Sequence, residues 1–218
     1  GVQTCALPIY GFLTLAKTRG DGTFGENIIS KVVWLDSIPN EIKPTNDSKV
    51  EIRGELYCTE ENFFKLSDEM VSLGLKKPTS QRNIVAGLIS RKDRLELCRY
   101  IEFKAFDVIM GDEKHLKTEM DKYHELKKYH FDTLEIALHK NEKDILKTIE
   151  AAKVFMSEGN YQIDGLVFAY NDLDLHKELG ETAHHPRYKM AFKFPGESKK
   201  TKIIDISWQV SRNGILTP

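Results

Sequence analysis

The sequence predicts an α+β fold, in which strands and helices are interspersed along one chain. Residues 50–57 alternate polar and apolar side chains with period two, the pattern of a strand with one buried face. Apolar residues then recur with helical spacing at Phe63, Leu66, Met70 and Leu73. Because both periods occur in neighbouring stretches, the chain must combine sheet with helix.

The composition is that of a globular protein with a core. The chain has 218 residues, of which 40% are hydrophobic and 30% charged. Its 32 Lys and Arg are balanced by 33 Asp and Glu, so a surface for nucleic acid would have to be a local patch. The three cysteines are widely spaced, which argues against a disulfide framework or a zinc site in this chain and favours a reducing compartment. No apolar run approaches the roughly 20 residues of a membrane helix.

Both ends of the chain are unusual. Residues 1–9 contain no initiator Met and no basic region, and they resemble translated adaptor sequence, so we expect them to be foreign. The other end stops at Pro218 without a polar tail. A Pro-Gly linker at 195–198 divides the rest, so we expect an incomplete domain at 10–196 and the beginning of another at 197–218.

The same patterns predict the remaining elements. Strands are expected at residues 10–16, 101–110, 163–170, 190–194 and 202–211, and helices at 142–156 and 173–179, the latter closed by Gly180. Residues 28–38 fit a helix or a strand, and residues 81–92 a loop or a short helix. The charged stretch 114–140 is most simply a solvated helical face, and its histidines lack the spacing of metal ligands.

The loop from Lys17 to Asn27 is the first candidate site. It contains three glycines and two acids, and glycine tolerates positive φ and the close approach of a ligand. Arg19 supplies a planar, permanently charged fork that suits phosphate. The same residues also fit an ordinary Gly-Asp-Gly hairpin turn with a solvated arginine, and the loop alone does not decide between the two.

Three charged residues, Glu55, Asp164 and Lys193, interrupt strands that otherwise read as buried. A buried charge without a partner is costly, so we expect them to share a polar cleft or to pair as structural ions. With Arg19, such a cleft suits a nucleotide. The acids can accept from ribose hydroxyls, and the cations can balance phosphate charge.

An ordered set of motifs over residues 10–218 gives the chain a family resemblance. In order they are Thr18-Arg19-Gly20-Asp21-Gly22-Thr23 with Glu26, Val50-Glu51-Ile52-Arg53-Gly54-Glu55, Arg82-Asn83 with Ala86-Gly87, Phe103-Lys104-Ala105-Phe106-Asp107, Ile163-Asp164-Gly165-Leu166-Val167, Leu179-Gly180, Pro186-Arg187-Tyr188, Ala191-Phe192-Lys193-Phe194-Pro195, and Asp205-Ile206 with Gln209-Val210, Arg212, Gly214 and Thr217-Pro218. Each motif alone is modest, but the ordered set is specific. The chain resembles the adenylation domain of the NAD-dependent DNA ligases.

The resemblance implies an ATP-grasp-like nucleotidyltransferase fold, shared by DNA ligases and mRNA-capping enzymes, with antiparallel sheets and flanking helices. Residues 197–218 would be the first strand of an OB-fold. The implied reaction has three steps. A lysine attacks the α-phosphate of NAD and releases nicotinamide mononucleotide, the AMP moves to the 5′-phosphate of a nick, and the 3′-hydroxyl displaces it.

The resemblance also implies the partners. NAD, Mg²⁺ or Mn²⁺, and nicked double-stranded DNA would bind, whereas Zn²⁺ would belong only to downstream modules that this chain lacks. We expect a monomer in the cytoplasm or nucleoid with no membrane partner. The family's nicotinamide-recognising, zinc-finger, helix-hairpin-helix and BRCT modules are expected outside the chain.

Catalytic and nucleotide-binding roles follow residue by residue. Asp164 would lie near the nucleophile and the metal ion, and Lys193 would contact the α-phosphate. Arg19 and Glu55 would contact the ribose and phosphate of the adenylate.

Other residues would contact the base and the DNA. Phe106 would stack on the adenine and Val167 would pack near its other face, although from sequence alone Phe106 reads equally well as core. Four arginines would face the nick or its phosphates, a salt-dependent role without sequence preference: Arg82, Arg91, Arg187 and Arg212.

The chain departs from the family where charge matters most. The nucleophilic lysine of the family lies in a Lys-x-Asp-Gly motif upstream of the glycine loop, and no such motif occurs before Thr18. Ala169 and the region of Met156 stand where the family has cations, and Ser90 stands where an arginine is usual, with Arg91 one place later. We therefore expect that this fragment alone cannot form the enzyme-adenylate.

Three hypotheses remain open from the sequence. The departures fit a divergent but active NAD-dependent ligase, or a non-catalytic homologue that binds nicked DNA or nucleotide. The run Ala105-Phe106-Asp107 also suits an ATP-dependent ligase or a capping-enzyme relative.

Overall fold

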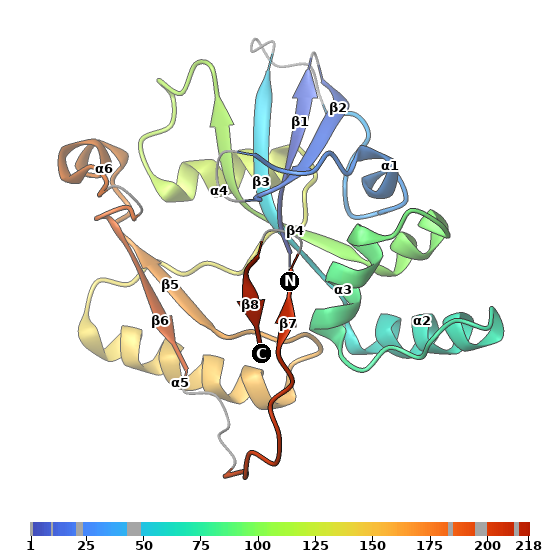
Figure 1. Cartoon of the computed structure of the whole chain (residues 1–218). Helices are drawn as coiled ribbons and strands as arrows, with labels where there is room; N and C mark the ends of the chain where they lie inside the picture. Colours follow the sequence, from blue (N-terminus) through green and yellow to red (C-terminus); the bar gives the residue numbers. More distant parts are fainter. Residues whose placement is uncertain are drawn as a thin grey trace.

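Four strands form the main sheet of the computed structural model, which describes residues 2–9, 11–20, 24–42, 49–182, 185–194, 200–211 and 214–218 (Figure 1). The strands lie in the order β2-β1-β3-β4, and every neighbouring pair is antiparallel. They are β1 (Val2–Ile9), β2 (Phe12–Thr18), β3 (Val50–Tyr57) and β4 (Glu102–Met110).

Helices and two small sheets complete the α+β fold that the sequence predicts. The helices are α1 (Ile29–Val32), α2 (Glu60–Ser72), α3 (Gln81–Ser90), the 3₁₀ helix η1 (Leu95–Tyr100), α4 (Glu119–Lys128), α5 (Glu142–Glu158) and α6 (Leu173–Leu179). The small sheets are the antiparallel pairs β5 (Gly165–Ala169) with β6 (Lys189–Lys193) and β7 (Gln209–Val210) with β8 (Leu216–Thr217).

Strand β3 has one face in the core and one polar face. Val50, Ile52 and Leu56 are almost completely buried in the main core, as the period-two pattern predicts. Helices α1, α2 and α3 lie to one side of the sheet in Figure 1 and contribute to this core. The alternate residues of β3, including Glu55, are left for the opposite face.

Local capping explains where the helices begin. The Thr59 hydroxyl accepts from the Asn62 N–H and caps the start of α2. Leu66 and Met70 of the predicted stripe are buried, whereas Leu73 is exposed. The Ser80 hydroxyl caps α3 in the same way, so residues 81–92 are mainly helix rather than loop. In the charged stretch 114–140, only α4 is helical.

The second sheet corrects one expectation from the sequence. Strands β5 and β6 are largely exposed, so Asp164 and Lys193 do not interrupt buried strands. Two short strands cannot cover both of their own faces, because burial needs a further layer on each side. Helix α5 lies beside this sheet but buries only Ala152 fully.

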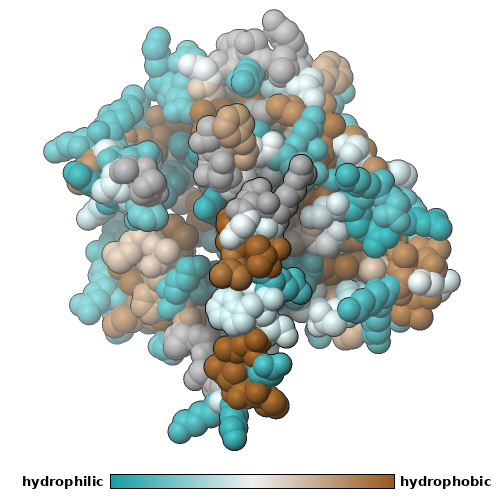
Figure 2. Space-filling view, in the orientation of Figure 1, coloured by the Kyte–Doolittle hydropathy of each residue, from teal (hydrophilic) through white to brown (hydrophobic). Residues whose placement is uncertain are grey.

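The C-terminal segment corrects another expectation. Of the predicted strand at 202–211, only Gln209–Val210 is a strand, because alternating residues form a strand only against a partner. Every described side chain from residue 200 onward is exposed, Ile204 to 96%, and Figure 2 shows hydrophobic atoms along this segment. The OB-fold assignment stays a prediction, and the linker at 195–198 lies outside the described residues.

Strand β1 comes from the segment that the sequence suggests is foreign. It lies between β2 and β3, with Thr4, Ala6 and Pro8 buried on one face. Alternating burial of this kind allows the segment to take a place in the sheet. The foreign origin of residues 1–9 stays a prediction. In the described part of the chain, no helix has the length and apolar character needed to cross a bilayer.

We predict that Leu66→Ala lowers the free energy of unfolding by about 2 to 5 kcal/mol, because it opens a cavity in the core beneath α2. Urea unfolding followed by circular dichroism measures this change. Leu146→Ala on α5 is the matched control, since Leu146 is 53% exposed. Equal losses for the two variants would contradict the assignment of the core.

Candidate nucleotide site

A cavity of about 460 Å³ brings together residues from the main sheet, α3 and the second sheet. Five of its lining residues are predicted site residues: Arg19, Glu55, Arg82, Asp164 and Lys193. The remaining lining residues are Gln3, Thr18 and Gly20. Residues more than 170 positions apart in the sequence therefore meet, as expected for one polar cleft rather than separate surface charges.

The glycine loop forms one wall of this cavity and is closed at its base. The Thr18 N–H donates to the Glu26 carbonyl at 3.0 Å, and the Glu26 N–H donates to the Thr18 hydroxyl at 3.0 Å. Gly20 has a φ of +56°, and a Cβ there would collide with the Phe24 carbonyl. Asp21, Gly22 and Thr23 lie outside the described residues, so the structure describes the base of the loop and not its tip.

Arg19 is positioned at the edge of the cavity by β1. Its backbone N–H donates to the Gln3 carbonyl, and its Nη1 donates to the Gln3 Oε1, each at 3.0 Å. The guanidinium has five N–H donors, so this contact leaves others for a ligand. Gln3 also lines the cavity. No motif predicts this role, because residues 1–9 read as foreign sequence.

Asp164 and Lys193 form an ion pair on the opposite wall. Lys193 Nζ lies 2.7 Å from Asp164 Oδ2, and both side chains are more than half exposed. The hydrogen bond from Lys193 is the largest cause that lowers the pKa of Asp164; partial burial opposes it, and the charges of Lys193 and Arg82 add to the lowering. The alternative of paired ions is thus confirmed for this pair, but within a cavity that also holds Arg19 and Glu55.

The cavity combines three cations with two carboxylates. Arg82 lies in the first turn of α3, and Glu55 lies on β3 directly opposite Lys104 of β4. Two guanidinium groups and an ammonium can surround a phosphate, because each offers several N–H donors and a positive charge. The carboxylates can accept from sugar hydroxyls. The arrangement suits an anionic ligand that carries hydroxyl groups.

Four predicted contact residues among the described part of the chain do not line the cavity. Phe106 on β4 and Val167 on β5 are exposed to 38% and 68%, Arg91 pairs with Asp93 at 2.9 Å, and Arg187 is exposed. Arg212 lies outside the described residues. The roles expected for these residues stay predictions. They belong to the family motifs, but a motif does not show that a side chain reaches the cavity.

Comparison with known proteins identifies the family. The model of the NAD-dependent DNA ligase adenylation domain matches residues 4–197. This chain belongs to that family. The resemblance read from the motifs is therefore confirmed over residues 4–197.

Named relatives agree with this assignment. The DNA ligase of Thermoanaerobacter sp. (strain X514) is 35% identical over 212 residues, which cover 95% of this chain and 31% of the relative. The DNA ligase of Petrotoga mobilis (strain DSM 10674 / SJ95) is 36% identical over 222 residues, covering 100% of this chain and 33% of the relative. The chain thus spans about a third of the length of these ligases.

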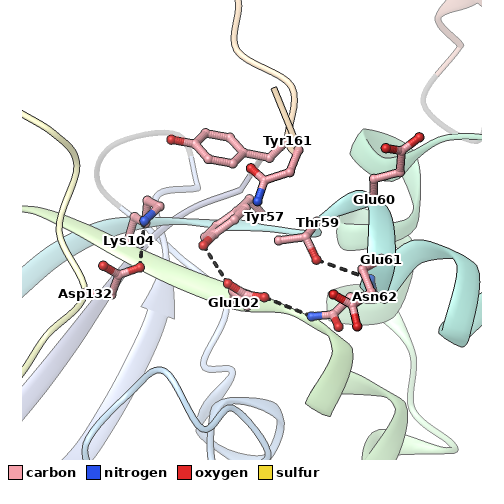
Figure 3. Close-up of a pocket in the computed structure, with 10 residues that line it drawn as sticks. Tyr57, Thr59, Glu60, Glu61, Asn62, Glu102, Lys104, Asp132 and Tyr161 are labelled. Atoms are coloured by element: carbon pink, nitrogen blue, oxygen red, sulfur yellow. Dashed lines mark hydrogen bonds and ion pairs between the residues drawn. The ribbon is translucent and has the colours of Figure 1, made fainter. Parts of the chain in front are cut away.

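The adenylation domain has a second cavity, of about 490 Å³, which no motif in the sequence predicts (Figure 3). The Tyr57 hydroxyl donates to Glu102 at 2.6 Å, the Asn62 amide donates to Glu102 at 2.9 Å, and Lys104 pairs with Asp132 at 2.7 Å. Burial, followed by the bond to Glu102, raises the pKa of Tyr57. None of the predicted site residues lines this second cavity, so the first cavity remains the candidate site.

Lys104 also holds two parts of the adenylation domain together. Its ammonium lies 5.7 Å from the ring centroid of Tyr57 and 5.9 Å from that of Tyr161. Tyr161 follows α5 and precedes Asp164 by three residues, and its ring packs 5.0 Å from Tyr57. The contacts of Tyr161 with Lys104 and Tyr57 therefore hold the segment that leads into β5.

Cys58 and Cys98 do not supply a nucleophile to the site. Cys58 and Cys98 are free and buried, and burial raises the pKa of the Cys58 thiol to about 12 and that of Cys98 to about 11. Both remain protonated at neutral pH, and the thiolate is the reactive form.

We predict that Lys193→Met raises the pKa of the Asp164 carboxyl toward the ordinary aspartate value. The substitution removes the hydrogen bond and the charge that lower the pKa. Carbon-detected NMR titration of the Asp164 side chain measures it. Arg82→Met should raise the pKa in the same direction by less, and no change in Lys193→Met would show that the ion pair does not form in solution.

Proposed function

We propose that this chain is the nucleotide-binding part of an NAD-dependent DNA ligase that seals nicks in duplex DNA through enzyme-adenylate and DNA-adenylate intermediates. The cavity that joins Arg19, Glu55, Arg82, Asp164 and Lys193 carries the proposal. Membership of the adenylation-domain family supports it. The printed names of the relatives, each a DNA ligase, support DNA as the second substrate.

In this proposal, the cations hold the phosphate. Lys193 contacts the α-phosphate of NAD, and Arg19 and Arg82 offer guanidinium donors from the other walls of the cavity. Charge that develops on the phosphate oxygens during transfer is thereby balanced. Glu55 accepts hydrogen bonds from ribose hydroxyls.

Binding of phosphate also changes the pairing of Asp164. Lys193 turns from the carboxylate toward the phosphate, at little cost because the pair is exposed and exposed ion pairs contribute about 0–1 kcal/mol. Asp164 is then available to bind Mg²⁺ or Mn²⁺ together with substrate phosphate, an arrangement in which one or two carboxylates suffice. The ion would supply further neutralisation of phosphate charge.

Base and DNA contacts complete the proposal. Phe106 and Val167 cover the two faces of the adenine, and their exposed side chains are free to receive a flat ring. The arginines proposed for the nick and its phosphates are Arg82, Arg91, Arg187 and Arg212.

The nucleophile is proposed to lie outside this chain. No Lys-x-Asp-Gly sequence occurs anywhere in the 218 residues, and Lys17 beside the loop does not belong to that pattern. The fragment is therefore expected to bind nucleotide without becoming adenylated.

A non-catalytic nucleotide- or nicked-DNA-binding homologue is the second candidate. It is favoured by two uncharged residues at positions where the family has cations. These are Ala169 on β5 and Met156, which is 42% exposed on α5. The sequence upstream of this chain distinguishes the two candidates, because only an active ligase requires a lysine nucleophile there.

We predict that the purified fragment forms no lysine-linked AMP when it is incubated with NAD labelled in the adenylate. The chain holds no Lys-x-Asp-Gly motif to attack the α-phosphate. Label that stays on the protein in a denaturing gel, resists alkali and is released by mild acid, as expected of a phosphoramidate, measures the reaction. Stable labelling of the fragment would disprove the proposed absence of the nucleophile.

The corresponding full-length protein provides the test of function. It is expected to seal nicked duplex DNA with NAD and not with ATP. Sealing supported by ATP alone would favour an ATP-dependent relative, and nucleotide binding without sealing would favour the non-catalytic homologue.

A further inference from the structure

One face of the second sheet carries a lysine at each end and small side chains between them. In the register of β5 with β6, Gly165 is opposite Lys193, Val167 is opposite Ala191, and Ala169 is opposite Lys189. Directly opposed residues of antiparallel strands share a face, so both lysines lie on the face that carries Val167. Lys193 lines the cavity, and the face therefore continues from the cavity toward Lys189.

The spacing of the two lysines matches the length of a nucleotide. They are four residues apart on β6, and a strand rises about 3.3 Å per residue, so their Cα atoms are about 13 Å apart. An extended nucleoside monophosphate has a similar length from its phosphate to the far edge of its base. Between the lysines, Val167 is apolar and 68% exposed, which suits the face of a planar ring.

Lys189 is fixed in position by α4, unlike the exposed Lys193. Its Nζ lies 3.0 Å from Oε1 of Glu119, and the two side chains are only 26% and 19% exposed. His176 lies beside the same carboxylate, with its Nδ1 3.5 Å from Glu119 Oε1. His176 Nε2 is 2.6 Å from the Tyr170 carbonyl, an acceptor only, so Nε2 carries a proton and donates.

The contact between Lys189 and Glu119 leaves the ammonium able to bind a ligand. Although the two groups are close, Glu119 Oε1 has no hydrogen-bond partner of suitable geometry among the described residues. The pair therefore acts through charge rather than through an aligned N–H bond. A lysine ammonium has three donors, and those of Lys189 remain available to an acceptor on a bound molecule.

We propose that Lys189, positioned by Glu119, binds the adenine base of a nucleotide whose phosphate lies at Lys193, Arg19 and Arg82. The ammonium donates to an acceptor nitrogen on the edge of the base, and Val167 packs against the ring. This inference rests on the proposed function, since it assigns the base end of the same nucleotide site.

If the pair of Lys189 with Glu119 were purely structural, its loss would have a different effect on ligand binding. Lys189 and Lys193 share strand β6, so a pair that merely holds this strand against α4 would affect phosphate binding as well. A base contact instead affects only ligands that contain a base. Adenosine 5′-monophosphate and ribose 5-phosphate differ in this respect alone and separate the two roles.

The test is calorimetric titration of the chain with adenosine 5′-monophosphate and with ribose 5-phosphate. We expect Lys189→Met to weaken binding of the nucleotide about tenfold, the effect of losing one hydrogen bond from a charged donor, and to leave ribose 5-phosphate within about twofold. Lys189→Arg keeps a charged donor and should lose less. Lys177→Met on α6 is the matched control and should bind both ligands as the unmodified chain does, because Lys177 pairs locally with Asp174.

Glu119→Gln provides a second variant that keeps the ammonium but releases it. This variant should weaken binding of adenosine 5′-monophosphate by a smaller factor than Lys189→Met does, and should leave the affinity for ribose 5-phosphate unchanged. Equal losses for both ligands in Lys189→Met, or no loss for either, would overturn the base contact. Failure of the unmodified chain to bind adenosine 5′-monophosphate would instead overturn the proposed function on which the inference rests.

Discussion

The alternation of side chains along β3 links the stability of this domain to its site. Ile52 and Leu56 are buried in the main core, while Glu55 between them lies on the opposite face and lines the cavity. A shift of one residue in the register of β3 would exchange these faces, so the packing that stabilises the sheet also directs Glu55 toward the site. The same rule places Lys193 and Lys189 on one face of β6, with Ala191 between them.

Charge within the cavity is arranged so that a ligand can replace an internal partner. Lys193 and Asp164 neutralise each other in the free domain, and both are exposed enough to exchange this contact for a phosphate or a metal ion. Because the pKa of Asp164 is lowered, the attraction is present at neutral pH and is lost as the pH falls through that lowered pKa. Acid should therefore weaken this pair.

Much of the fold and part of the site could be predicted from the sequence. The period of β3 and the helical stripe of α2 each reflect burial on one side, which a single strand or helix records in its own residues. The family motifs brought Arg19, Glu55, Arg82, Asp164 and Lys193 into one prediction, and all five line the cavity. In contrast, the alternation at 202–211 misled, because a strand also needs a neighbour that its own sequence does not encode.

Features that depend on contacts between distant elements could not be predicted. Gln3 reaches Arg19 only through the pairing of β1 with β2, and Lys189 meets Glu119 only where β6 approaches α4. The second cavity likewise depends on Tyr161 reaching Tyr57 after the long helix α5. None of these contacts follows from periodicity or local spacing, which describe one element at a time.

We propose that the nucleotide binds in the cavity between the main and second sheets. The most direct measurement is a ¹H–¹⁵N NMR titration of the chain with adenosine 5′-monophosphate, in which the residues whose signals move report the site. We expect shifts at Gly20, Glu55, Arg82 and Lys193, which line that cavity. Shifts confined to the second cavity, at residues such as Asn62, Asp132 and Tyr161, would contradict it.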